Sequence, residues 1–342
     1  TIDRGQTGIA SHSYATAGTH TITILGLFPH FNMDNFNVDF DNRNKLMTVA
    51  QWGDQPWSSM EYAFSDAENF TITATDAPDL SGVTSLRSMF EGTGAFNQSI
   101  DHWDVSNITN MKSLFRNTSV FNQPLDNWNV GQVTTMEDMF ASADAFNQNI
   151  SMWDVSNVVD MEGMFEDNII FNQPLNGWDV SKVENMEDMF EEAEAFNQDL
   201  DLWDVSSVTN MDDMFYEAKA FNGNVSTWDV SKVESTDETF REAISFNQDL
   251  NNWDVSSLTT INGMFEGATL FNGDISGWNV SNVTNYGGAF EGALAFNQDL
   301  SAWDVSAMTD GNSMFQNAAV FNQDISGWDV SSVTNYVDFD RN

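Results

Sequence analysis

One phrase of 25 residues repeats through most of the chain, and this repeat limits the possible folds more than any other feature. Each copy begins with Phe-Asn, and a Trp follows seven residues after the Phe. The first residues of the copies are Phe96, Phe121, Phe146, Phe171, Phe196, Phe221, Phe246, Phe271, Phe296 and Phe321. A fixed period of this length is typical of a solenoid, whose units bury their apolar residues against their neighbours. We therefore expect a stack of similar coils rather than compact domains.

Two short elements are predicted within each unit. In residues 103–106 apolar and polar side chains alternate, which indicates a short strand. The apolar residues Ile108, Met111, Leu114 and Phe115 then follow at the spacing of one face of a helix. The pattern predicts an α/β repeat solenoid of the leucine-rich-repeat type, wound as a right-handed coil. Short parallel strands would form one face of this coil and short helices the other, with the Phe and Trp residues in the core.

The chain divides into three predicted segments. Residues 1–27 contain alternating β-branched residues and a turn, and they are predicted to form a β-hairpin that caps the N-terminal end of the stack. This stretch resembles the final hairpin of a PKD-type β-sandwich domain, although it is too short to be the whole domain. Residues 28–80 are a transition with degenerate first repeats, and residues 81–342 are the regular solenoid of about ten repeats.

Charge and composition exclude several classes of partner. The chain has 11 basic and 52 acidic residues, for a net charge of −41, so neither nucleic acid nor an anionic membrane surface is an expected ligand. Cations and basic proteins suit this charge. There is no cysteine, and no apolar run is long enough to insert into a membrane. The four histidines lie outside any metal-ligand or catalytic-triad spacing, so we predict that the protein is not an enzyme.

The acidic residue that follows the Trp of each unit gives the main candidate site, which we call the Asp ladder. Its members are Asp104, Asp154, Asp179, Asp204, Asp229, Asp254, Asp304 and Asp329. If each Trp points inward, the next side chain points outward, and the central five, Asp154, Asp179, Asp204, Asp229 and Asp254, are predicted to contact a partner. Two alternatives remain for the repelling carboxylates. They bind Ca²⁺, or each caps a turn by accepting hydrogen bonds from the Ser two residues later.

Three further predictions concern polar residues. Asp34, Asp39 and Asp41 lie in a stretch rich in Asp and Asn and are candidate Ca²⁺ ligands. No other cofactor is required. The Asn after each Phe is predicted to stack on itself and to satisfy backbone groups. Acids of the predicted helices, such as Glu187, Asp188, Glu191, Glu192 and Asp213, are expected to form a solvated face.

The repeated phrase also resembles that of a known family. The consensus F-N-Q-D-L/I-S-x-W-D-V-S-x-V-T-N-M-x-x-M-F covers residues 81–340 and is similar to the repeat of BspA-like bacterial surface proteins, a leucine-rich-repeat group. The resemblance implies a monomeric, non-enzymatic recognition or adhesion module outside the cell or on its surface. Its partner would be a protein or glycan of a host or neighbouring cell. A passive acidic spacer and a carbohydrate-binding module with exposed Trp residues are the alternatives.

Overall fold

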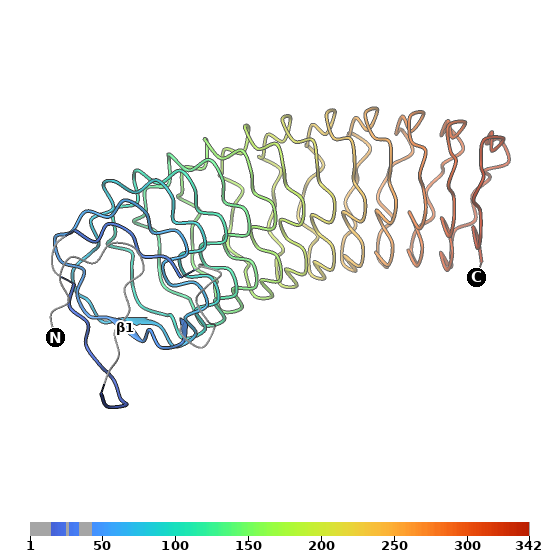
Figure 1. Ribbon diagram of the computed structural model, residues 1–342. Helices are drawn as coiled ribbons and strands as arrows, with labels where there is room; N and C mark the ends of the chain where they lie inside the picture. Colours follow the sequence, from blue (N-terminus) through green and yellow to red (C-terminus); the bar gives the residue numbers. More distant parts are fainter. Residues whose placement is uncertain (1–14, 25–26, 34–42, 342) are drawn as a thin grey trace.

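The computed structural model describes residues 15–24, 27–33 and 43–341 of the chain. Most of this length winds into a stack of coils that follow one another along a single rod, with the blue coils of the N-terminal half at one end and the red C-terminal coils at the other (Figure 1). Each coil corresponds to one 25-residue repeat, because equivalent residues of successive repeats lie beside each other and pair in parallel. The predicted repeat solenoid is therefore confirmed.

Strand structure in the described residues is sparse. Strand β1 (Thr48–Val49) and strand β2 (Thr71–Ile72) pair in parallel, with Thr48 opposite Thr71. Beyond them, single parallel bridges join successive coils at one position in each repeat. The bridged residues are Ser85, Asn110, Thr135, Asp160, Asn185, Asn210, Ser235, Thr260, Asn285, Asp310 and Asn335. The parallel face is therefore a column of one-residue bridges rather than a sheet of short strands.

The strand predicted at residues 103–106 is not formed. The chain turns there instead, since the N–H of Trp103 donates to the carbonyl oxygen of Ile100 at 3.0 Å and the N–H of Ile108 donates to that of Val105 at 2.9 Å. The bridge of this coil lies later, at Asn110. The Asp ladder is consequently a column at a turn, and the predicted strand face lies elsewhere on the coil.

The predicted helices of the repeats are also wrong, since residues 44–341 contain none. In the coil of residues 101–125, two successive four-residue turns occupy the expected helix. The N–H of Leu114 donates to the carbonyl oxygen of Met111 at 3.2 Å, and that of Thr118 donates to Phe115 at 3.2 Å. The third residue of each turn, at positions 113 and 117, has a φ of 54° and 57° respectively. A left-handed residue at every fourth position is incompatible with a right-handed helix.

Backbone hydrogen bonds in these turns alternate in direction. In each turn, the residue directly before the one that closes the turn donates its N–H to the next coil. The N–H of Ser113 donates to the carbonyl oxygen of Glu137 at 2.8 Å, and the N–H of Asn117 donates to that of Ala141 at 2.9 Å. Every second N–H therefore closes a turn within its own coil, and the others hold the following coil. The backbone N–H groups of the turns thus find hydrogen-bond acceptors without a helix, and half of these bonds connect each coil to the next.

The core consists of aromatic columns, as predicted. Phe190 and Phe196 of one coil stack with ring centroids 4.0 Å apart, and Phe190 stacks on Phe215 of the next coil at 5.5 Å. The Trp rings stack in the same way, with 6.3 Å between Trp203 and Trp228. The nine Trp residues at 25-residue intervals over residues 103–303 are only 2–4% exposed. Burial of these large rings is the main source of apolar stabilisation.

The N-terminal segment is described only in part. Residues 15–24 contain no strand and are exposed, with Ile22 at 72% and Ile24 at 53%. The remainder of the predicted hairpin, in residues 1–14 and 25–26, lies outside the described residues. Within the part of the chain that the structure describes, no helix has the length and apolarity needed to cross a membrane.

Candidate functional site

The Asp ladder lies on the surface, and its carboxylates cap turns. Asp154, Asp179, Asp204, Asp229 and Asp254 are all exposed, and each accepts a hydrogen bond from the backbone N–H of the Ser two residues later. Asp179 Oδ1 accepts from Ser181 Oγ at 2.6 Å and from Ser181 N at 3.1 Å. These bonds from Ser181 lower the pKa of Asp179. The turn-capping alternative therefore accounts for these residues, because the bonds offset their mutual repulsion.

The candidate Ca²⁺ ligands Asp34, Asp39 and Asp41 lie outside the described residues. In the part of the chain that is described, no group of three or more His, Asp or Glu side chains is placed to hold a metal ion. This includes the Asp ladder, where successive carboxylates are separated by a whole coil. The geometry of the described residues thus gives Ca²⁺ no site on the ladder.

The Asn after each Phe does stack on itself. The N–H of Asn197 donates to Asn172 Oδ1 at 3.0 Å, and the N–H of Asn222 donates to Asn197 Oδ1 at 2.9 Å. The same bond recurs along the solenoid, and the column lies at the surface rather than in the core. Its role is structural, because each amide oxygen satisfies a backbone donor of the next coil.

A different surface, which we call the turn face, is a second candidate site. It is formed by the two four-residue turns of each coil, and two columns of residues with φ between 51° and 69° run along it. The first column is Ser88, Ser113, Asp138, Gly163, Asp188, Asp213, Glu238, Gly263, Gly288 and Ser313. The second column is Gly92, Asn117, Ser142, Asp167, Glu192, Glu217, Glu242, Gly267, Gly292 and Asn317.

Side chains in these columns lean over the next coil. Asp138 Oδ1 lies 2.8 Å from the place that a Cβ would take on Gly163, and Glu238 Cγ lies 3.0 Å from the corresponding place on Gly263. Where the next residue of a column is another acid instead of glycine, the carboxylates are forced together. This occurs in the middle of the solenoid, in the coils that contain residues 160–168, 185–193 and 210–218.

Burial and this crowding raise the pKa values of the central acids. Burial, followed by the neighbouring carboxylates of Asp213 and Glu187, raises the pKa of Asp188 to about 7. Burial and then Asp188 raise the pKa of Glu191 to about 8, and burial with Glu238 raises that of Asp213 to about 6. These residues are partly buried. The expectation of a solvated helix face is thus wrong, because the turns hold the carboxylates against one another.

Few cations balance these acids. Arg116 pairs with Asp138 at 3.3 Å, and Arg241 pairs with Glu238 at 2.6 Å and with Glu266 at 3.1 Å. Between these two arginines, the turn-face segments 135–143, 160–168, 185–193 and 210–218 contain neither Lys nor Arg. Lys219, directly after the last segment, pairs with Glu217 at 3.3 Å and with Glu194 at 2.6 Å. The centre of the turn face is therefore a strongly negative surface with a cationic residue on either side of it.

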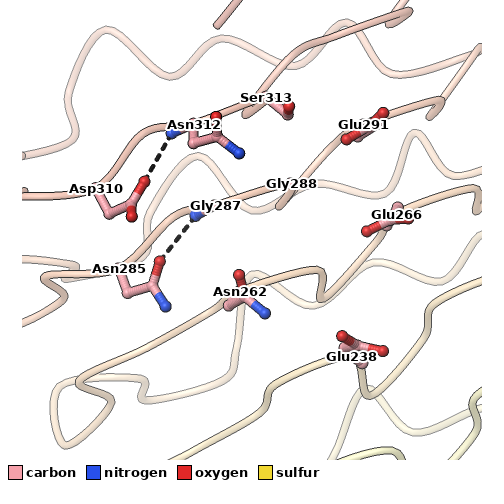
Figure 2. A pocket seen from close by; sticks show the side chains of 10 residues that line it. All are labelled: Glu238, Asn262, Glu266, Asn285, Gly287, Gly288, Glu291, Asp310, Asn312 and Ser313. Carbon is pink, nitrogen blue, oxygen red and sulfur yellow. Dashed lines mark hydrogen bonds between the residues drawn. The ribbon is translucent and has the colours of Figure 1, made fainter. Parts of the chain in front are cut away.

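A hollow of about 270 Å³ lies on the turn face beyond Arg241. Its floor contains Gly287 and Gly288, and its walls contain carboxylates and amides (Figure 2). The full lining is Glu238, Asn262, Glu266, Asn285, Gly287, Gly288, Glu291, Asp310, Asn312 and Ser313. A second hollow lies near the N-terminal end, around Arg87, Lys112 and Arg116, and mixes both signs of charge.

Sequence reasoning missed the turn face because the two turns mimic a helix. A usable signal was nevertheless present. Glycine recurs at positions 163, 263 and 288 of one column and at 267 and 292 of the other, where Asp, Asn and Ser also occur. These are the residues that most readily adopt positive φ, and their recurrence every four residues indicates turns.

Comparison with known proteins identifies the repeats. A family model described as "Mycoplasma protein of unknown function, DUF285" matches residues 58–168, 127–205, 147–252 and 237–340, which together span most of the chain. No curated protein sequence matches the chain.

Solved structures offer only distant similarity. A TLR13–ssRNA13 complex is 12% identical with a TM-score of 0.28 and is matched over 70% of this chain and 34% of that chain. The chain thus spans about a third of the length of that protein. The leucine-rich repeat domain of APL1 is 11% identical, with a TM-score of 0.25 and coverage of 81% and 87%. A leucine-rich repeat protein from Bacteroides ovatus is 12% identical, with a TM-score of 0.22 and coverage of 82% and 84%. Superpositions this loose carry no functional argument.

Proposed function

The chain belongs to the family described as Mycoplasma protein of unknown function, DUF285, and from this premise we propose that its solenoid works as a protein-interaction module. The proposed binding surface is the turn face, and the proposed partner is a protein with a basic surface. One observation carries this proposal. The carboxylates of Asp188, Glu191 and Asp213 are partly buried, have raised pKa values, and have no Lys or Arg in their own turn-face segments.

A raised pKa means that the folded protein disfavours the charged form of the carboxylate. A cationic side chain placed beside such a group stabilises its charged form, and the Coulomb attraction between the two charges is stronger at a partly buried site than in bulk water. The net charge of −41 also attracts a basic partner over a longer range. Because the turns repeat in every coil, an extended partner can form the same contact several times.

We further propose that the module is non-enzymatic and acts outside the cell or on its surface, on a partner from a host or neighbouring cell. The resemblance of its repeat to that of BspA-like surface proteins supports this location. The lack of cysteine is compatible with it. A protein partner is favoured over a glycan, because the Trp columns that a carbohydrate-binding module would present are buried in the core.

The proposal is tested with two variants that each replace three carboxyl groups by amides, on different faces. The turn-face variant combines Glu187→Gln, Asp188→Asn and Glu191→Gln. The Asp-ladder variant combines Asp154→Asn, Asp179→Asn and Asp204→Asn. Binding of a basic and an acidic protein of similar size to each immobilised variant is measured at about 150 mM salt, where the Debye length is about 8 Å and distant charges are screened.

We expect the basic protein alone to bind, and the turn-face variant to lose most of this binding while the Asp-ladder variant keeps it. Equal losses in both variants would indicate non-specific attraction to net charge and would contradict a binding face. The absence of any binding by the wild-type protein would favour the passive spacer instead.

A further inference from the structure

The hollow beyond Arg241 exists because side chains are missing from its floor. Gly263, Gly267, Gly288 and Gly292 occupy four neighbouring places in the two columns of positive φ. Gly287 lies next to them, at a place where the preceding and following coils have Asn262 and Asn312. We call this hollow the glycine groove. Of these glycines, only Gly287 and Gly288 line the hollow, and because other coils carry side chains at these places, the hollow is not part of the regular repeat.

The walls of the glycine groove favour a cation with several hydrogen-bond donors. The ten lining residues include four carboxylates, three Asn side chains and no Lys, Arg or aromatic residue. Glu238, Glu266 and Glu291 follow one another along successive coils on one side, and the amides lie across the two glycines (Figure 2). Asp310 accepts a hydrogen bond from the backbone N–H of Asn312, and Asn285 accepts one from the backbone N–H of Gly287. These bonds hold the Asp310 and Asn285 side chains in place at the groove.

The chain itself shows how this surface holds a guanidinium group. Arg241 donates to Glu238 at 2.6 Å and reaches Glu266 of the following coil at 3.1 Å, and its guanidinium carbon lies 5.4 Å above the ring of Tyr216. One group with a planar fork of donors thus bridges carboxylates of two coils. Further along the groove, Glu266 and Glu291 occupy the same place in successive coils, and among the described residues no side chain forms an ion pair with both of them.

We propose that the glycine groove binds an arginine side chain of the basic partner, with the guanidinium bridging Glu266 and Glu291 as Arg241 bridges Glu238 and Glu266. This inference rests on the proposed function and names the chemical group recognised at one place on the turn face. A metal ion suits the groove less well, because no three acidic side chains converge in the described residues. Burial raises the pKa of Glu266, Arg241 lowers it, and Glu291 raises it again, so a second cation would relieve the remaining repulsion.

The test uses a short peptide of alternating arginine and serine, and the same peptide with neutral citrulline in place of arginine. Two groove variants take residues that the neighbouring coils already have at these places, so that folding is preserved. Gly287→Asn fills the groove, as Asn262 and Asn312 do in their own coils, and Glu291→Gln copies Gln316. Asp179→Asn, which copies Asn129, removes the same charge from the Asp ladder as a matched control. Affinities are measured by isothermal titration calorimetry.

We expect the arginine peptide to bind the wild-type protein and the citrulline peptide to bind far more weakly. Each groove variant should weaken the arginine peptide on the order of tenfold, as expected for the loss of a charge-assisted hydrogen bond, and Asp179→Asn should not. Amide NMR signals of Gly287 and Gly288 should shift during the titration. Unchanged affinity in both groove variants, or shifts confined to the segment 185–218, would overturn the groove while leaving the turn face as the binding surface. If the wild-type protein binds neither the arginine peptide nor a basic protein, the proposed function itself is contradicted, and the groove proposal falls with it.

Discussion

The indole Nε1 of Trp203 donates a hydrogen bond of 2.9 Å to the backbone carbonyl oxygen of Leu175, 28 residues earlier in the chain. The same carbonyl accepts the backbone N–H of Trp178 at 3.0 Å. Both lone pairs of this oxygen are therefore used, one within its own coil and one by the next coil. An equivalent indole bond is made by every Trp from Trp128 to Trp328. The Trp column is thus both an apolar core and a set of hydrogen bonds between coils.

Replacement of Trp203 should separate these two contributions. We expect Trp203→Phe to lower the free energy of unfolding by about 1–3 kcal/mol, because a buried hydrogen bond and part of a ring are lost. Trp203→Ala should cost about 3–5 kcal/mol, since it leaves a cavity. Urea unfolding followed by circular dichroism measures both. Leu202→Ala is the control, because Leu202 is 71% exposed and its loss should have little effect. Equal stability of the Phe variant and the wild type would contradict a role for the indole bond.

A glycine in the Phe-Asn segment should not tolerate even a methyl group. A Cβ on Gly223 would lie 2.0 Å from the backbone oxygen of Gln198, which cannot move without shifting the coil. We therefore expect Gly223→Ala to destabilise the protein by about 1–3 kcal/mol, as overpacking of a filled site does. Gly177→Ala is the matched control, since no atom lies within 4 Å of its Cβ position. Thermal unfolding of the two variants compares them directly, and similar midpoints would show that the coils adjust freely.

Stability should fall as the pH rises from about 4 to about 8. Asp188, Glu191 and Asp213 have folded-state pKa values of about 7, 8 and 6, against ordinary values of 3.8, 4.5 and 3.8. The folded protein therefore binds more protons than the unfolded chain in this range. The stabilisation is fully present below the ordinary values and is lost as the pH rises through the raised ones. Chemical unfolding at a series of pH values measures the slope.

A combined variant identifies the groups responsible for this slope. Asp188→Asn, Glu191→Gln and Asp213→Asn together should flatten it between pH 5 and 8 by removing the titrating carboxylates. Asp179→Asn should leave it unchanged, because the hydrogen bonds of Ser181 lower the pKa of Asp179 and its contribution is lost only as the pH falls through that lowered value. A slope that survives in the combined variant would assign the pH dependence to other acids.

The Asn column should contribute modestly to stability. In Asn197→Ala the backbone N–H of Asn222 loses its acceptor, at present 2.9 Å away. Because this column lies at the surface, water can replace the amide oxygen, and we expect a loss of about 0.5–1.5 kcal/mol. Amide hydrogen exchange at Asn222 should become faster in the same variant. Asn252→Ala, at an exposed position of a later coil, is a control, and equal exchange at Asn222 in both variants would contradict the bond.

The buried columns could be predicted from the sequence, whereas the backbone between them could not. A fixed period places each Trp and each Phe over its equivalent in the next coil, so burial of Trp203 or Phe196 follows from the repeat alone. The spacing of Met111, Leu114 and Phe115 fits a helix, but it fits two successive four-residue turns equally well, because both place apolar residues three and four positions apart. The choice depends on whether positions 113 and 117 adopt positive φ, which side-chain hydrophobicity does not report.

The candidate sites, too, could be predicted from the sequence only in part. The exposure of the Asp ladder could be predicted from the inward direction of Trp, and its carboxylates cap turns, while its contact with a partner stays a prediction. The raised pKa values of Asp188 and Glu191 depend on contacts between coils that a helical model places apart. The glycine groove requires Gly287 and Gly288 to lie on the turn face between carboxylates of neighbouring coils, which becomes evident only when the turns are known.

The alternating direction of the backbone hydrogen bonds has a mechanical consequence. Half of the N–H groups in the turns hold the next coil, so a force that pulls the two ends of the rod apart loads these bonds first. Any coil at an end of such a stack has a neighbouring coil on one side only and should peel away before the interior coils. Each coil would then release 25 residues, or roughly 85 Å of extended chain at about 3.4 Å per residue. Under tension the molecule would lengthen in regular steps, as a tether that absorbs load one coil at a time.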